Sequence, residues 1–180
     1  MKKYILAGGE CAGKTTTSKA LQGLGYHVIS ESNAALISNE REQKGNIFPW
    51  TNFEEHNRRV IELQLERERK IPQSESIIFL DRALTDVYGY YVVFEKEPPK
   101  NLLVLINQAH YECVFYFEMI PKELVEKFRE RNRRNSHETA RTAHEIIKKV
   151  YQTTFNIPLI NVPFASEEER VKFILEHIHE

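Results

Sequence analysis

The feature that most constrains the fold is the stretch GGECAGKT, from Gly8 to Thr15. Apolar or aromatic residues precede it, and helix-forming residues follow it. The spacing Gly-x4-Gly-Lys-[Ser/Thr] between a strand and a helix predicts a loop whose backbone N–H groups point at an anion. Average residue usage would produce this pattern by chance in roughly one chain of this length in a hundred. We therefore expect a phosphate-binding loop rather than a plain turn.

Each residue of this loop has a predicted role. Lys14 is expected to place a positive charge on the outer phosphates of a nucleoside triphosphate, and the Thr15 hydroxyl to join a Mg²⁺ shell. Cys11 is interpreted as a small spacer rather than as a redox switch. The residues predicted to hold the nucleotide are Gly8, Gly9, Glu10, Cys11, Ala12, Gly13, Lys14, Thr15 and Thr16.

Five short apolar segments predict a parallel sheet, because each is nearly continuous in apolar residues, as strands buried on both faces are. Helical patterns lie between them, at 51–71, from Pro121 onward, at 137–155 and after Ser166. Alternating strands and helices predict an α/β fold, and 180 residues suit a single domain. The segments are KYILA (3–7), YHVI (26–29), SIIFL (76–80), CVFYF (113–117) and PLINV (158–162).

Composition narrows the class of protein. The formal net charge of −1 disfavours a general nucleic-acid surface, so a bound anion must be held by a local site. Only two cysteines occur, and this favours a reducing compartment. The apolar run near the start is too short for a signal peptide, and no window is long enough to span a membrane. We expect a cytoplasmic protein without a membrane partner.

A second motif supports the phosphate loop. Ile77-Ile78-Phe79-Leu80-Asp81 is an apolar strand that ends in an acid, the form of a Walker B strand. Asp81 is expected to hold Mg²⁺ directly or through water, because an open α/β sheet gathers its site at the strand ends.

These motifs together resemble the small P-loop kinase-like ATPases that include the ribosylnicotinamide kinase domain, and more distantly the deoxynucleoside and thymidylate kinases. The resemblance covers nearly the whole chain, through GGECAGKTT, Ile29-Ser30-Glu31, FLDRALTDVYGYY and NVPFASEEERVKFIL. It implies a three-layer α/β/α sandwich with a five-stranded parallel sheet. The strand ending at Asp81 would lie next to the strand that feeds the phosphate loop.

The resemblance also implies catalytic roles. Glu31 would accept the proton of the attacking hydroxyl, and Arg82 would contact the substrate or a phosphate. The alternative is a buried Glu31–Arg82 ion pair that joins two strand ends. Asp86 and Tyr90, spaced i and i+4, could line the acceptor pocket, although Tyr90 could equally be a core residue.

An arginine-bearing lid is implied at about residues 129–141. At least one of its guanidinium groups is expected to reach the transferred phosphoryl group. The alternative is a solvated helix face partnered by Glu126 and Glu130. The arginines are Arg129, Arg131, Arg133 and Arg134.

Three functions are compatible with these motifs. The first is a Mg²⁺-dependent kinase that moves the γ-phosphoryl group of ATP, or of GTP, to a small hydroxyl-bearing metabolite such as a nucleoside or nucleotide. The second is an ATP-dependent regulatory switch or slow ATPase that acts on a protein partner. The third, a nucleic-acid 5′-end kinase, is disfavoured because the sequence has no long basic stripe. The acceptor is not fixed by any motif, although Phe48-Pro49-Trp50 could stack on it or simply pack.

Overall fold

The computed structural model describes residues 1–9, 12–121 and 137–178. Its centre is a sheet with the strand order β2-β3-β1-β4-β5. Every neighbouring pair of strands is parallel, and β3 lies next to β1, as the family resemblance implies. The strands are β1 (Lys2–Gly8), β2 (His27–Ile29), β3 (Ile77–Asp81), β4 (Tyr111–Phe117) and β5 (Leu159–Val162).

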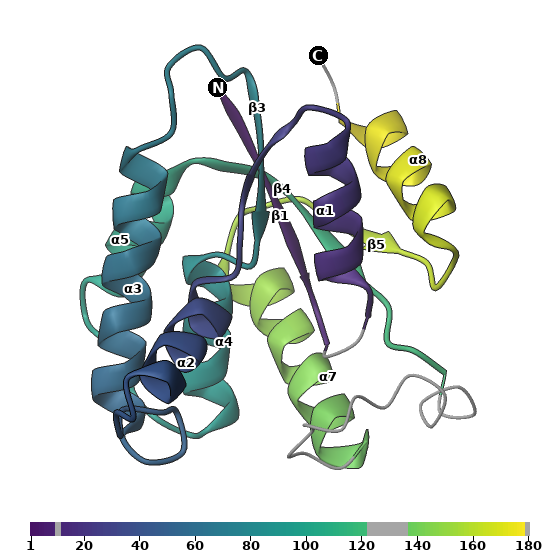
Figure 1. Cartoon of the computed structure of the whole chain (residues 1–180). Helices are drawn as coiled ribbons and strands as arrows, with labels where there is room; N and C mark the ends of the chain where they lie inside the picture. Colours follow the sequence, from purple (N-terminus) through teal and green to yellow (C-terminus); the bar gives the residue numbers. More distant parts are fainter. Residues whose placement is uncertain (10–11, 122–136, 179–180) are drawn as a thin grey trace.

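Helices cover both faces of this sheet, so the predicted α/β class is confirmed (Figure 1). Helices α1 and α8 pack against each other on one face, and α4 and α7 pack against each other on the other. The helices are α1 (Lys14–Gly23), α2 (Ser32–Glu42), α3 (Phe53–Arg69), α4 (Leu84–Val93), α5 (Leu102–Ala109), α7 (His137–Thr154) and α8 (Glu167–His177).

Alternate residues of the central strand feed two separate cores, because successive side chains of a strand point to opposite faces. Ile5 and Ala7 of β1 belong to the core under α3, α4, α5 and α7. Tyr4 and Leu6 belong to the core under α1 and α8. All four side chains are buried, which explains why β1 reads as one continuous apolar run.

Two helices, α2 and α5, are not predicted from the sequence. The buried residues of α2 are the polar Ser32 and Glu40, so this helix has no apolar stripe to reveal it. Helix α5 is only eight residues long and strongly apolar, so its periodicity is hard to read. Residues 96–101 lie outside any helix or strand, and Ser166 forms a capping box with Glu169 at the start of α8. The helix predicted from Pro121 lies outside the described residues.

The sheet lies between two layers of helices, so the described segments form a three-layer α/β/α sandwich. None of the helices in residues 1–9, 12–121 and 137–178 is long and apolar enough to cross a membrane.

Candidate active site

The phosphate-loop sequence lies where β1 ends and α1 begins, as predicted. Gly8 has a φ of 130°, and a Cβ at this position would lie 2.6 Å from the carbonyl oxygen of Phe117 in β4. Gly13, which caps α1, has a φ of 87°. Both glycines are thus required by backbone conformation, and Gly8 also by the close approach of a neighbouring strand. Glu10 and Cys11 lie outside the described residues.

Lys14 is buried and turns back over the loop. Its Nζ donates a hydrogen bond to the carbonyl oxygen of Gly9 at 2.7 Å. Burial, with a further contribution from the positive charge of Arg82, lowers the pKa of Lys14 to about 8. A buried cation beside a phosphate-binding loop is in position to neutralise an anion there.

Asp81 at the end of β3 lies beside the start of α1. Thr15 Oγ1 donates to Asp81 Oδ2 at 2.9 Å, and Ser18 Oγ lies 3.5 Å from the same oxygen. Asp81 Oδ1 is buried and has no hydrogen-bond partner among the described residues. The pKa of Asp81 is raised, chiefly because burial disfavours its charged form.

This pair of oxygen ligands fits a divalent cation. A hydroxyl that donates its proton to Asp81 keeps its lone pairs free, and Asp81 Oδ1 lacks a partner. Within the described segments, no group of three or more acidic, histidine or cysteine side chains could hold a metal by itself. Mg²⁺ suits such a sparse site, because it usually keeps several waters and takes further ligands from substrate phosphates.

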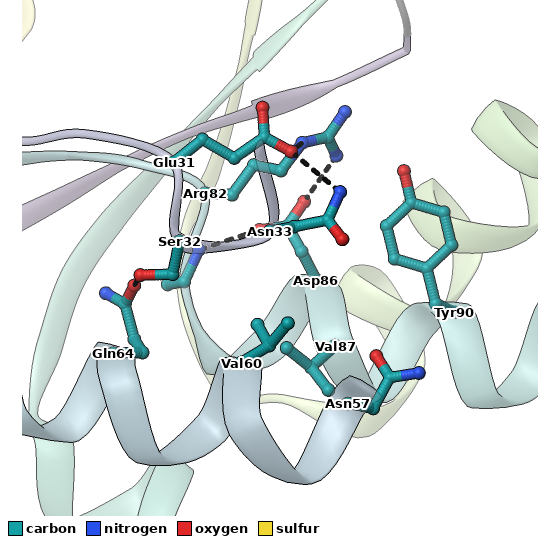
Figure 2. Close-up of a pocket in the computed structure, with 11 residues that line it drawn as sticks. Glu31, Ser32, Asn33, Asn57, Val60, Gln64, Arg82, Asp86, Val87 and Tyr90 are labelled. Atoms are coloured by element: carbon teal, nitrogen blue, oxygen red, sulfur yellow. Dashed lines mark hydrogen bonds and ion pairs between the residues drawn. The ribbon is translucent and has the colours of Figure 1, made fainter. Parts of the chain in front are cut away.

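Arg82 leaves the strand in an unusual conformation. Its φ is 69°, which is uncommon for a residue with a side chain, and its backbone N–H donates to Leu6 O at 3.1 Å. This turn directs the guanidinium toward two acids: Nε lies 3.1 Å from Glu31 Oε1, and Nη1 donates to Asp86 Oδ1 at 3.2 Å (Figure 2). The ion pair that the sequence left as an alternative role for Glu31 and Arg82 is therefore present.

The residues around Arg82 favour its protonated, positively charged form. Burial alone would lower the pKa of Arg82, but the neighbouring Tyr90, Glu31, Asp86 and Asp81 offset burial and raise the pKa well above its usual value. Non-glycine residues with positive φ cluster at functional sites. The conformation of Arg82 therefore agrees with a role beyond packing.

A small cavity whose lining residues are mostly polar lies beside this ion pair. Its volume is about 30 Å³, enough for one water molecule, and its lining includes Glu31, Asn33, Arg82, Asp86 and Tyr90 (Figure 2). Asp86 and Tyr90 both line this cavity, and their predicted contact with an acceptor stays a prediction. An acceptor larger than water can enter only if the cavity opens.

A larger cavity of about 430 Å³ adjoins the phosphate loop between α4 and α7. Its lining includes Gly8 and Gly9, the apolar Phe94 and Ile147, and again Tyr90. Tyr90 therefore lines both cavities.

A chain of polar contacts leads away from Glu31. Asn33 Nδ2 donates to Glu31 Oε1 at 3.4 Å, and Asn33 Oδ1 lies 2.8 Å from His56 Nε2. The other ring nitrogen of His56 lies 3.2 Å from the carbonyl oxygen of Ile47. Asn33 and His56 therefore connect the predicted base to the segment between α2 and α3.

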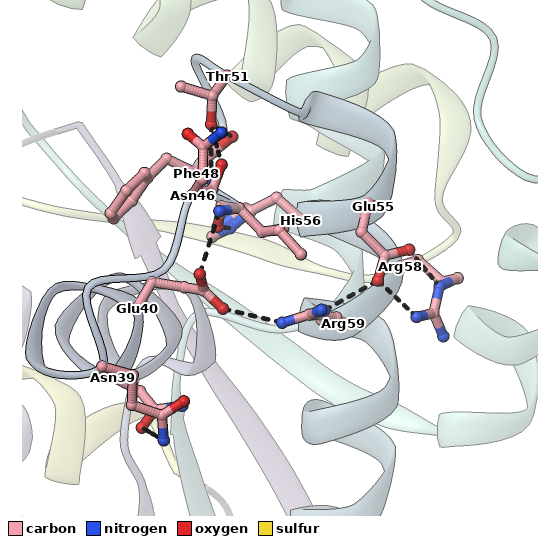
Figure 3. Close-up of polar contacts among 11 residues, drawn as sticks. Asn39, Glu40, Asn46, Phe48, Thr51, Glu55, His56, Arg58 and Arg59 are labelled. Atoms are coloured by element: carbon pink, nitrogen blue, oxygen red, sulfur yellow. Dashed lines mark hydrogen bonds and ion pairs between the residues drawn. The ribbon is translucent and has the colours of Figure 1, made fainter.

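That segment is fixed by buried charge rather than by its aromatic residues. Glu40 accepts hydrogen bonds from Arg59 Nη1 at 2.8 Å and from the Ile47 N–H at 3.1 Å (Figure 3). Phe48 and Trp50 stack on each other with ring centroids 4.9 Å apart. Neither ring lines the two cavities, and of the two roles that the sequence leaves open, the stacked rings agree with simple packing.

Helix α7 is joined to the phosphate loop by a residue that sequence reasoning missed. The Gly9 N–H donates to His144 Nδ1 at 3.0 Å. Burial lowers the pKa of His144 to about 4, so its ring is neutral at physiological pH and its Nδ1 can accept. Because Gly9 and His144 are 135 residues apart, no local pattern indicates this contact.

A second contact joins α7 to α4. The Tyr151 hydroxyl donates to Asp86 Oδ2 at 2.8 Å and lies 2.6 Å from Thr85 Oγ1. Asp86 Oδ2 also accepts from the Ala83 N–H at 3.0 Å. Asp86 therefore lines the small cavity while both of its carboxylate oxygens already accept hydrogen bonds from neighbouring residues.

The lid arginines stay predictions. Residues 137–141 of the predicted lid are the first residues of α7. The remaining lid residues, including all four arginines, lie outside the described residues: Arg129, Arg131, Arg133 and Arg134.

Several solved structures share this fold. Deoxyadenosine kinase from M. mycoides matches with a TM-score of 0.68, at 17% identity and with 97% of each chain covered. The YorR protein from Bacillus subtilis matches with a TM-score of 0.62, at 16% identity, over 99% of this chain and 100% of that one. Thymidylate kinase from Candida albicans matches with a TM-score of 0.59, at 12% identity, over 97% of this chain and 89% of that one. At these identities the likeness shows the fold.

The family is shown by the sequence itself. No curated protein matches the chain. A family model described as an AAA domain matches residues 3–170, nearly the whole chain. The predicted resemblance to P-loop kinase-like ATPases is thereby confirmed. The chain belongs to this family of AAA domains, and its fold is the one found in P-loop nucleoside and nucleotide kinases.

Proposed function

We propose that this protein is a Mg²⁺-dependent phosphotransferase that moves the γ-phosphoryl group of ATP to a hydroxyl of a nucleoside or nucleotide. The observation that carries the proposal is the position of Glu31. Its carboxylate lies at the polar cavity, 3.1 Å from Arg82, and Arg82 directly follows Asp81 of the predicted metal pair. An acid, a cation and a phosphate loop at one edge of a sheet suit transfer between two bound substrates.

The proposed reaction is a direct displacement. The acceptor hydroxyl gives its proton to Glu31, and the acceptor oxygen forms a bond to the γ-phosphorus. The bond from that phosphorus to the bridging oxygen of ADP breaks, and ADP leaves. Lys14 holds the outer phosphates, and Arg82 fixes the direction of the Glu31 carboxylate. Positioning and charge neutralisation supply most of the catalysis in such reactions.

Mg²⁺ belongs to this proposal because the ligands fit it. Thr15 and Asp81 would hold the ion, and when bound it would neutralise charge on the phosphate chain. The predicted lid arginines would add to that neutralisation.

The names of similar structures support a nucleoside-type acceptor. The deoxyadenosine kinase was solved with dCMP and dCDP, and also with dATP. The polar residues around the small cavity, among them Asn33 and Asp86, are of the kind that recognise hydroxyl and amide groups.

The deciding experiment is ADP release from MgATP with and without a panel of nucleosides, nucleotides and ribosylated vitamins. We expect one acceptor to stimulate ADP release. Lys14→Ala should lose nucleotide binding, and Glu31→Gln should bind MgATP but lose most of the stimulated turnover. If the wild type binds MgATP and no acceptor changes ADP release, the regulatory switch that acts on a protein partner becomes the better assignment.

A further inference from the structure

Arg170, in the first turn of α8, has no role in the site described so far. Only 8% of its surface is exposed, and its side chain reaches from the outer helix to the phosphate loop. A Cβ on Gly13 would lie 2.7 Å from Cζ and Nη2 of Arg170 and 3.0 Å from Nη1. The guanidinium therefore lies close against the backbone of Gly13, next to Lys14.

The hydrogen bonds of Arg170 fix this position. Nε donates to Thr17 Oγ1 at 3.1 Å, and Nη1 donates to the carbonyl oxygen of Ala165 at 2.6 Å. Thr17 belongs to the first turn of α1, and Ala165 to the segment between β5 and α8. Arg170 thus ties the segment that follows the last strand to the helix that follows the phosphate loop.

The charge of Arg170 has no counter-ion among the described residues. Both of its acceptors are neutral oxygens, and no carboxylate of the described residues lies within ion-pair distance. Burial lowers its pKa, opposed only by the negative charge of Glu167, yet an arginine stays protonated at physiological pH. Its Nη2 donates to no described residue. Buried charges are normally paired, but the described residues give this guanidinium no anionic partner. Its place beside a phosphate-binding loop favours an anion bound at that loop.

We propose that Arg170 is a binding residue for the donor nucleotide and that the phosphate chain of this nucleotide is its counter-ion. This inference rests on the proposed donor site. Lys14 and Arg170 would then supply positive charge beside the loop from α1 and α8, with Arg170 held rigidly by Thr17 and Ala165. Electrostatic attraction acts strongly where water is excluded, so Arg170 need not touch the phosphates to favour them.

A purely structural role predicts different behaviour. If Arg170 only pins two segments together, its removal lowers the stability of the free protein and leaves nucleotide affinity unchanged. If the guanidinium of Arg170 pairs with a bound phosphate, removing this side chain lowers nucleotide affinity. It also removes a buried charge that has no counter-ion among the described residues of the free protein.

The test compares three variants by thermal unfolding and by calorimetric titration with MgADP. Arg170→Met keeps the length and removes the charge, and Arg170→Lys keeps the charge with fewer hydrogen bonds. Lys172→Met is the matched control, because Lys172 lies on the same helix with 77% of its side chain exposed.

We expect Arg170→Met to weaken MgADP binding about tenfold or more, with little loss of melting temperature in the free protein. Arg170→Lys should keep most of the affinity, and Lys172→Met should match the wild type. Wild-type affinity in Arg170→Met, or equal losses in Arg170→Met and Arg170→Lys, would overturn the inference. If the wild type itself binds no MgADP, the proposed donor site has failed, and this outcome is distinct from the failure of Arg170 alone.

Discussion

Three neighbouring charges at the carboxyl edge of the sheet, Lys14, Asp81 and Arg82, are buried together. Each changes the proton affinity of the others: the positive charge of Arg82 lowers the pKa of Lys14, and the charge of Lys14 opposes the rise in the pKa of Asp81. Strongly perturbed ionisable groups in a cleft are typical of functional sites. This coupling leads to two predictions about single residues.

The first concerns Lys14 and pH. The pKa of Lys14 is about 8 in the free protein, and a bound phosphate chain would raise it. Between these two values, binding must take up a proton, so nucleotide affinity should fall as pH rises above about 8. The loss should approach tenfold per pH unit, since one pKa unit corresponds to about 1.4 kcal/mol. Titration calorimetry from pH 7 to 9.5 in two buffers of different ionisation enthalpy would measure both affinity and proton uptake.

Lys14→Arg is the control for this pH dependence, because an arginine does not titrate in this range. The same decline in Lys14→Arg would assign the dependence to another group.

The second prediction concerns Asp81 and the metal. Asp81→Asn keeps the size of the side chain and an oxygen that can accept from Thr15, but it removes the negative charge. We expect MgADP to bind more tightly than metal-free ADP in the wild type, and the two to bind alike in Asp81→Asn. Affinity measured with and without EDTA tests this. A Mg²⁺ effect that survives in Asp81→Asn would place the ion elsewhere.

Among the elements, α7 links the two sides of the site. His144 accepts from the backbone of the phosphate loop, and Tyr151, farther along the helix, holds Asp86 beside the small cavity. Between them Ile147 packs closely on α4, because a Cβ on Gly89 would lie 3.0 Å from it. A displacement of α7 would therefore disturb both the phosphate loop and the small cavity beside Asp86.

The packing of α7 on α4 can be measured through Tyr151. Tyr151→Phe removes a buried hydroxyl that bonds to Asp86 and contacts Thr85, so we expect a loss of roughly 1–3 kcal/mol in the free energy of unfolding. Tyr88→Phe is the control, since the Tyr88 ring packs on Phe155 while its hydroxyl bonds to no described residue. Urea unfolding of both variants gives the comparison. Equal stability of Tyr151→Phe and Tyr88→Phe would show that the buried hydroxyl contributes little.

The sequence predicts elements well where burial is continuous or periodic. All five strands agree with the prediction within one or two residues, because each is a nearly continuous apolar run. Helix α2 was missed because its buried side chains are polar, and α5 because it is short.

At the site, the sequence predicts residues that stand in local motifs and misses those that act across the fold. Lys14, Thr15 and Asp81 follow from two motifs, and the structure brings them together. His144 and Arg170 reach the phosphate loop from residues far along the chain, and only the packing of α7 and α8 brings them there.

In the molecule as a whole, the two faces of the sheet serve different substrates in the proposed reaction. The donor side lies with α1 and α8, where Arg170 meets the phosphate loop. The acceptor side lies with α3, α4 and the start of α2, around the polar cavity. The phosphate loop joins the two sides at the end of the central strand (Figure 1).

Because the site draws on so many elements, nucleotide binding should stabilise the whole fold. A ligand that binds only the folded state adds about 2.7 kcal/mol to the free energy of unfolding when its concentration is 100 times the Kd. We expect MgADP to raise the melting temperature of the wild type and to leave that of Lys14→Ala unchanged. Equal shifts in the two proteins would mean that MgADP binds away from the phosphate loop.

The strand order also has a consequence for synthesis. Leu6 of β1 is flanked by Asp81 of β3 on one side and by Phe115 of β4 on the other. The ribosome therefore releases β1, with the whole phosphate-loop motif, long before either neighbour exists. A nascent chain that stops short of Phe117 carries the complete motif but lacks the framework that shapes it. We expect such a chain to bind no nucleotide, and its apolar first strand to depend on chaperones until β4 has emerged.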